Sequence, residues 1–260
     1  MKQPSIRASY AKWILTPQIE GERVMQIDGV KIAGFSGFSS YLGAFSNRPD
    51  EVELSYLKRN IPAGGVVLDV GANFGVMSVI MSRLSGPGGR VFAFEPIPAT
   101  FEALETNIRR NGCSNVTCLG LGVGAKAGTL RFTNSSDAAT NRMDPSADLA
   151  VPVTSIDEFC AQKDIDRIDF LKIDVEGAEL QVLEGSRQHF EAGSIAAGMI
   201  EVCPGNLARF GITTVDLHRA LTGWGYHLHW FDAPEIELTE NAFAQLSESF
   251  LGNAGFRRRA

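Results

Sequence analysis

From about residue 65 onward, short apolar runs alternate with segments whose apolar residues recur at helical spacing. The apolar runs predict strands at residues 65–71, 90–96, 115–123, 167–174 and 195–202. The helical patterns cover residues 74–85, 98–111, 154–164, 177–191 and 214–225. Further strands are predicted at residues 226–232 and within 247–253, with a short extra strand at 128–133.

Strands this apolar are typical of a parallel sheet that helices cover on both faces. Right-handed crossovers then give a doubly wound α/β sheet. Ligands bind such sheets beyond the carboxyl ends of the strands. We therefore expect the functional site along the rim where these strands end.

Residues 1–60 do not follow the alternation. Residues 23–35 predict a β-hairpin that turns at Asp28 and Gly29, and residues 49–60 predict an amphipathic helix. We therefore divide the chain into an N-terminal extension, residues 1–60, and a main domain, residues 61–260. A cap over the site, a cover for the sheet edge and a dimerisation segment all remain open for the extension. The polar residues 133–150 are interpreted either as a lid or as a solvated loop.

The composition narrows the class of partner. The chain has 260 residues, 44% of them hydrophobic, and a formal net charge of −6. This charge argues against a protein that grips nucleic-acid phosphates. The basic run at 257–259 is short and is expected to be a solvated tail.

The location of the protein is predicted from what the sequence lacks. No apolar run approaches the roughly 18 residues of a membrane span. The first residues hold no apolar core of signal-peptide length. The four cysteines show no metal-binding spacing and are interpreted as buried small residues in a reducing compartment. We expect a cytoplasmic protein without a membrane partner, and leave homo-oligomerisation open.

The turn after the first strand of the main domain has the features of a cofactor site. Asp69 ends the strand, and Gly71, Asn73 and Gly75 follow. Gly71 permits a tight turn and a close backbone approach, and Asn tolerates a positive φ. Gly75 begins the helix, whose terminus offers free N–H groups. Glu95 follows at the end of the second strand, where a carboxylate can accept both hydroxyls of a ribose.

This pattern serves either NAD or S-adenosylmethionine. The NAD fingerprint G-x-G-x-x-G would need glycines where Asn73 and Val76 stand. S-adenosylmethionine has no pyrophosphate, and Asp69 suits its ammonium group. We therefore favour S-adenosylmethionine.

Three motifs, "VVLDVGANFG", "VFAFEP" and "IDFLKIDVEGAELQVLEG", occur in this order. They resemble the FkbM-type S-adenosylmethionine-dependent methyltransferases over roughly residues 50–205. The resemblance implies a class I methyltransferase fold in residues 61–260, which is Rossmann-like, with a seven-stranded, mostly parallel sheet whose last strand is antiparallel. It also implies O-methylation of a small hydroxylated metabolite such as a sugar, glycan or polyketide. The predicted cofactor-binding residues are Asp69, Gly71, Asn73, Gly75, Glu95, Pro96 and Asp174.

The candidates for catalysis lie on the same rim. Asp174, Glu176 and Glu201 are carboxylates at strand ends, and Lys172 is a cationic partner. Asp174 is the first choice for a group near the reacting methyl, because its strand is expected beside the first one. A structural network of ion pairs and caps remains the alternative for all of them.

Other assignments stay open at this stage. His227 and His229 share a strand face and could supply a base, although satisfied histidines are commoner. The three carboxylates could hold Mg²⁺, but the sequence does not fix that geometry and we assign no metal ligand. The rival functions are an NAD-dependent oxidoreductase and a cofactor-binding protein without turnover.

Overall fold

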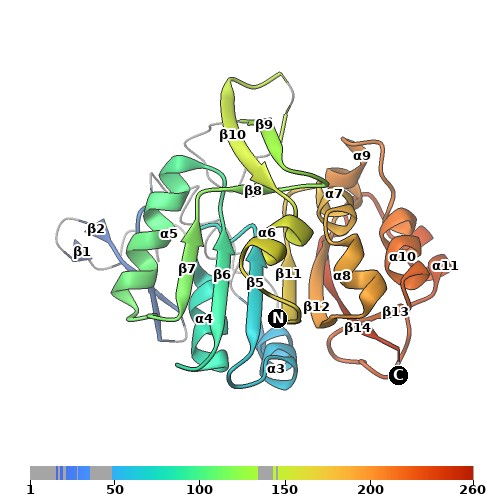
Figure 1. Cartoon of the computed structure of the whole chain (residues 1–260), viewed down its shortest axis with the longest axis horizontal. Coiled ribbons are helices and arrows are strands. Elements are labelled where there is room, and N and C mark those ends of the chain that lie inside the picture. The colour runs from blue at the N-terminus through green and yellow to red at the C-terminus, as the bar shows by residue number, and fades with distance from the viewer. Residues whose placement is uncertain are drawn as a thin grey trace.

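The computed structural model describes residues 16, 18–19, 22–27, 29–35, 49–133, 143–144 and 146–259. At its centre is a seven-stranded sheet (Figure 1). Its strands are, in spatial order, β13 (Tyr226–His229), β14 (Gly252–Arg258), β12 (Ile195–Val202), β11 (Ile168–Ile173), β5 (Val66–Val70), β6 (Arg90–Phe94) and β7 (Val116–Leu119). The strands from β12 to β7 pair in parallel, whereas β14 pairs antiparallel with both β12 and β13. The predicted fold class is confirmed.

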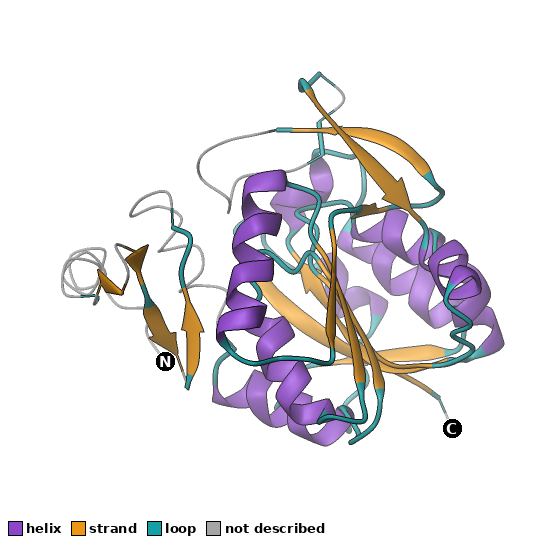
Figure 2. Cartoon of the chain, turned by 60° about the vertical axis from the view of Figure 1, so that its left-hand side comes forward, coloured by secondary structure: helices purple, strands orange, loops and turns teal. Residues whose placement is uncertain are grey.

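Helices cover both faces of the sheet, as Figure 2 shows. One apolar core gathers residues of α3 (Glu51–Asn60), α4 (Val76–Ser85) and α5 (Pro98–Arg110). The other gathers residues of α6 (Ile156–Gln162), α7 (Glu179–Glu184), α8 (Arg187–Ala192), α9 (Pro204–Ala208), α10 (Thr214–Gly223) and α11 (Glu240–Ala244).

Residues 177–191 were predicted as one helix, but they form two short ones, α7 and α8. The break falls at Gly185, where a side chain would lie 2.1 Å from the carbonyl oxygen of Gly124. Only a glycine allows the backbone this approach.

The predictions for the C-terminus were wrong. The last strand is β14, at Gly252–Arg258, and not within residues 247–253. Arg257 and Arg258 are exposed, as predicted, but they belong to this strand and not to a tail. Arg257 donates from Nε to His227 Nε2 at 2.8 Å, and Arg258 donates from Nη1 to the carbonyl of Gly193 at 3.2 Å. Phe256, one residue earlier, is fully buried.

A smaller sheet stands above the carboxyl ends of the main strands (Figure 1, top). It consists of β8 (Gly122–Val123), β10 (Leu149–Thr154) and β9 (Gly128–Phe132), in that order. The extra strand predicted at 128–133 is confirmed as β9. Strand β10 was not predicted, because its first residues belong to the polar segment 133–150. Much of that segment lies outside the described residues, so both interpretations of it stay predictions.

The N-terminal segment contains the predicted hairpin and helix. Strands β1 (Gln18–Ile19) and β2 (Glu22–Arg23) pair first, and then β3 (Met25–Ile27) pairs with β4 (Val30–Ile32) around Gly29, which has φ +78°. Asp28 lies outside the described residues. Helix α3 begins with a capping box of Asp50 and Glu53. Its Tyr56 hydroxyl donates to the carbonyl of Gly198 at 2.9 Å, so this helix shares the core of the main sheet.

The helices and the cysteines bear on the predicted location. Within the described ranges, no helix is long and apolar enough to cross a membrane. All four cysteines are free thiols, but only Cys160 is fully buried, while Cys113, Cys118 and Cys203 are half-buried.

Candidate active site

The turn between β5 and α4 has the conformation that its residue types allow. Gly71, Asn73 and Gly75 all have positive φ, at 81°, 51° and 87°. The N–H groups of Gly71 and Ala72 donate to the carbonyl of Phe94 at 3.1 and 2.9 Å. The turn is thereby bound to the end of the neighbouring strand β6.

The predicted close approach of the Gly71 backbone is a contact with another backbone segment of the same chain. A side chain at this position would lie 1.8 Å from the carbonyl oxygen of Asp174, at the end of β11. A side chain at Gly75 would lie 2.6 Å from Leu104 on α5. Both glycines therefore fix the packing of the turn, whatever they contribute to a ligand.

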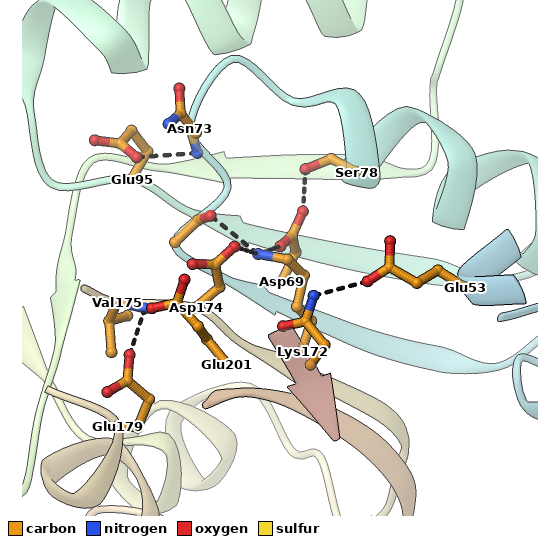
Figure 3. Close-up of polar contacts among 12 residues, drawn as sticks. Glu53, Asp69, Asn73, Ser78, Glu95, Lys172, Asp174, Val175, Glu179 and Glu201 are labelled. Atoms are coloured by element: carbon orange, nitrogen blue, oxygen red, sulfur yellow. Dashed lines mark hydrogen bonds and ion pairs between the residues drawn. The ribbon is translucent and has the colours of Figure 1, made fainter. Parts of the chain in front are cut away.

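Glu95 holds this turn from the side of β6. Its carboxylate accepts the N–H of Ile97 at 3.0 Å and the N–H of Asn73 at 3.0 Å (Figure 3). The side chain is 6% exposed. Burial raises the pKa of Glu95 to about 7, against the two backbone hydrogen bonds and Lys172, which lower it. Each carboxylate oxygen can accept one more hydrogen bond.

Lys172 is a buried cation between two carboxylates. Its Nζ lies 3.1 Å from Asp174 and 3.4 Å from Asp69, and it donates to the carbonyl of Gly71 at 3.2 Å. Burial lowers the pKa of Lys172, but the charges of Asp174 and Asp69 raise it above its ordinary value. Asp69 is fully buried and also accepts from Ser78 Oγ at 2.5 Å. The structure therefore pairs Asp69 with the ammonium of the chain's own lysine.

Two further carboxylates meet on the same rim. Glu176 follows β11 with φ 57°, and Nδ2 of Asn206 bridges it at 2.8 Å to Glu201 at 3.3 Å. Burial, and next the charge of Asp174, raise the pKa of Glu176 to about 7. The same two causes raise the pKa of Glu201 to about 9. The structure thus brings together the three carboxylates that the sequence singled out.

The sequence did not single out other members of this rim. Glu179 is 1% exposed and accepts the N–H groups of Val175 and Gly177 at 3.2 and 3.1 Å, so it closes the loop between β11 and α7. Glu53 comes from the N-terminal helix α3 and accepts from Nδ2 of Asn253 at 2.7 Å. Burial raises the pKa of Glu53, and Asp174 adds to this effect.

Two cavities open at the rim and share part of their walls. The larger has a volume of about 750 Å³ and includes six predicted site residues: Gly71, Asn73, Glu95, Pro96, Asp174 and Glu176. The smaller has a volume of about 290 Å³, and Lys172 and Phe74 are in its wall. Gly71, Asn73 and Asp174 line both. Asp69, Gly75 and Glu201 line neither of these two cavities.

The histidines lie apart from both cavities. His227 accepts a hydrogen bond from Arg257, and His229 is 1% exposed with its ring 5.5 Å from that of Tyr56. Burial lowers the pKa of His229 to about 4. In the described part of the chain, no group of three or more His, Cys, Asp and Glu side chains is arranged to hold a metal ion.

The model of the methyltransferase FkbM domain matches residues 69–231. The chain belongs to the FkbM methyltransferase family. The predicted resemblance is confirmed, and with it S-adenosylmethionine as the cofactor of the domain.

Several named methyltransferases are similar to this family member over part of their length. It is 30% identical to methyltransferase sdnD of Sordaria araneosa, over 51% of this chain and 64% of that protein. It is 34% identical to the hexuronic acid methyltransferase AglP of Haloferax volcanii, over 46% and 49%. It is 29% identical to the 31-O-demethyl-FK506 methyltransferase FkbM of Streptomyces tacrolimicus, over 50% and 63%. The chain therefore spans about half to two thirds of the length of these relatives.

A solved structure shows the same fold at low identity. SMU.1697c of Streptococcus mutans, solved in complex with SAH, has a TM-score of 0.50 and 11% identity, over 82% of this chain and 99% of that chain. This likeness concerns the fold alone.

The larger cavity of this FkbM-family chain fits S-adenosylmethionine. Its wall combines the Glu95 carboxylate, which can accept ribose hydroxyls, with apolar side chains that suit an adenine ring. These apolar residues are Phe94, Ile97, Leu121 and Val123. Asp174 and Glu176 supply negative charge for a cationic methionine group, and they would repel the pyrophosphate of NAD.

Proposed function

We propose that this chain transfers a methyl group from S-adenosylmethionine to a hydroxyl oxygen of a small neutral metabolite, with Glu176 as the general base. The observation that carries the proposal is the position of Glu176. Its carboxylate lines the cofactor cavity beside Asp174, and its pKa is raised to about 7. A base whose pKa lies near the working pH is best suited to accept a proton in the transition state.

The rim residues have different tasks in this reaction. S-adenosylmethionine supplies a methyl group bound to a sulfonium. Glu176 accepts the proton of the hydroxyl group, and Asn206 holds its carboxylate in place. One oxygen of Asp174 is engaged by Lys172, so Asp174 is better suited to orient ligands than to remove a proton. Glu201 has a pKa near 9 and is protonated at neutral pH, which limits repulsion next to Glu176.

The charge of the rim supports a neutral acceptor. Asp174 and Glu176 line the larger cavity, and Lys172, in the smaller one, is already paired with two carboxylates. An anionic acceptor would lie against like charges in a partly buried site, which costs free energy. Among the relatives' named substrates, this favours a hydroxyl like that of 31-O-demethyl-FK506 over the charged group of a hexuronic acid.

A screen with isotopically labelled methyl donor would test this proposal. Matched pairs of glucosides and glucuronides, together with hydroxylated polyketides, would serve as acceptors. We expect label in neutral acceptors as a base-stable ether. Label found only as a base-labile methyl ester, or no label in any acceptor, would contradict the proposal.

The role of Glu176 is tested with the first acceptor that reacts. Glu176→Gln should lower turnover by about 10²–10⁴-fold and leave the affinity for S-adenosylhomocysteine nearly unchanged. Glu184→Gln, an exposed glutamate on α7, is the matched control. Full activity in Glu176→Gln would show that another group acts as the general base.

A further inference from the structure

Helix α5 and its C-cap present two asparagines to the N-terminal hairpin, Asn107 in the helix and Asn111 at the cap. Asn107 accepts the N–H of Ala33 at 2.9 Å and donates to its carbonyl at 3.0 Å. Asn111 accepts the N–H of Lys31 at 2.9 Å and donates to its carbonyl at 2.7 Å. Each side-chain amide thus bonds the backbone of this segment as a neighbouring strand would.

The spacing of the two asparagines matches the spacing of the strand. Four residues of a helix rise about 6 Å, and two residues of a strand span about 6.6 Å. The chain then continues along α5, where Gly34 has φ +90° and a side chain on it would lie 2.6 Å from Ala103 Cβ. Strand β4 therefore lies along α5 (Figure 2). The side-chain amide of Asn111 covers the free edge of this strand at Lys31.

Asn107 makes one contact that Asn111 does not make. Its Nδ2 also donates to the carbonyl of Phe74, at 3.0 Å, in the turn between β5 and α4. The side chain is fully buried, and Arg110 donates to its oxygen at 3.3 Å, so both protons and both acceptor positions of the amide are used. A fully satisfied buried amide holds its partners in a single arrangement.

This contact connects the hairpin to the cofactor cavity. Phe74 follows Asn73, whose N–H donates to Glu95. A continuous series of bonds therefore runs from Ala33 through Asn107 and the turn to the Glu95 carboxylate. The ring of Phe35, just beyond the docked segment, lies 5.4 Å from the ring of Phe74 and supports the same residue.

We propose that Asn107 is a positioning residue for the turn between β5 and α4, which we call the cofactor turn, and that the docked hairpin sets the affinity for S-adenosylmethionine. The N-terminal segment then acts as a support of the turn. The proposal rests on the cofactor assignment and not on the acceptor. It can therefore be tested by the binding of S-adenosylhomocysteine, without turnover, and its failure would leave the proposed O-methylation untouched.

The test compares Asn107→Ala with Asn111→Ala in the full chain. Both variants lose two hydrogen bonds to the hairpin, but only Asn107→Ala loses the bond to the turn. We expect Asn107→Ala to weaken S-adenosylhomocysteine binding about tenfold by calorimetry, and to speed amide exchange at residues 73–76. Asn111→Ala should lower Tm but keep the affinity within about twofold. Equal losses of affinity in both variants, or none in Asn107→Ala, would overturn the role of Asn107.

A second variant, Gly34→Val, tests the connection between the hairpin and the cofactor turn from the side of the hairpin. It can be used if Asn107→Ala does not fold. Gly34→Val places a side chain against Ala103 and forces the hairpin off α5, while Asn107 stays unchanged. We expect the affinity for S-adenosylhomocysteine to fall here as well, with faster amide exchange in β4. Faster exchange in β4 with unchanged affinity would overturn the role of the hairpin.

Discussion

Glu95 uses one acceptor position of each carboxylate oxygen to hold the backbone at the turn between β5 and α4, and the residue lines the larger cavity. We expect Glu95→Ala to weaken S-adenosylmethionine binding by about 1.5–3 kcal/mol, the range for hydrogen bonds to a charged group. The measurement is calorimetry at pH 8, because the pKa of Glu95 is about 7 and the carboxylate is ionised there. Glu102→Ala, an exposed glutamate on α5, is the control. Equal affinities in the two variants would show that Glu95 does not bind the ribose of the cofactor.

The sequence predicted the individual rim residues only in part. Asn73 and Glu95 follow from their spacing after two strands. Lys172, Asp174 and Glu176 stand at every second position, which is the spacing of one strand face, but β11 ends at Ile173 and the positive φ of Glu176 breaks the period of two. Asn107 gave no signal, because its partners lie 74 and 33 residues away in the chain.

At the scale of elements, apolar runs predicted the central parallel strands well, since both their faces are buried. The failure at β14 has a physical reason. This strand is paired on both sides, yet only Ala254, Gly255 and Phe256 are buried, and the arginines at its end reach outward. A polar run at a chain end therefore concealed an interior strand. Strand β10 was not predicted for a related reason, because exposed and buried residues alternate along it.

The small sheet above the rim forms part of the wall of the larger cavity, and this contribution can be tested. Along β9, Leu130 and Phe132 face the larger cavity, while Thr129 lies on the other face of the strand. We expect Phe132→Ala to weaken S-adenosylmethionine binding by about 1–2 kcal/mol, since part of an apolar side chain no longer covers the ligand. Tm should change little, because Phe132 is only half-buried without the ligand.

Thr129→Ala is the matched control for this wall, since it shortens an exposed side chain on the same strand. Isothermal calorimetry on both variants decides the prediction. If Phe132→Ala binds as tightly as Thr129→Ala, the small sheet does not contact the cofactor.

For the whole molecule, the buried carboxylates contribute to the pH dependence of stability. Burial raises the pKa of Glu95, Glu176 and Glu179 to about 7 and that of Glu201 to about 9. Their ordinary value is 4.5, so the folded chain binds more protons than the unfolded chain above this pH. The free energy of unfolding should therefore fall as pH rises from 5 to 9. Denaturant titrations of the ligand-free protein measure this, and a rise over that range would contradict the raised pKa values.

The same carboxylates should make cofactor binding release protons. A cation near a carboxyl group favours its ionised form, and S-adenosylmethionine carries a sulfonium charge that S-adenosylhomocysteine lacks. Groups that titrate near pH 7 will then lose protons when S-adenosylmethionine binds. At pH 7 we expect its binding enthalpy to vary with the ionisation enthalpy of the buffer, and its affinity to rise from pH 6 to 8. S-adenosylhomocysteine should show a smaller release, and Glu176→Gln should reduce the difference between the two ligands. If both ligands release the same number of protons, the rim carboxylates do not sense the sulfonium, and the reactive methyl group lies away from Glu176.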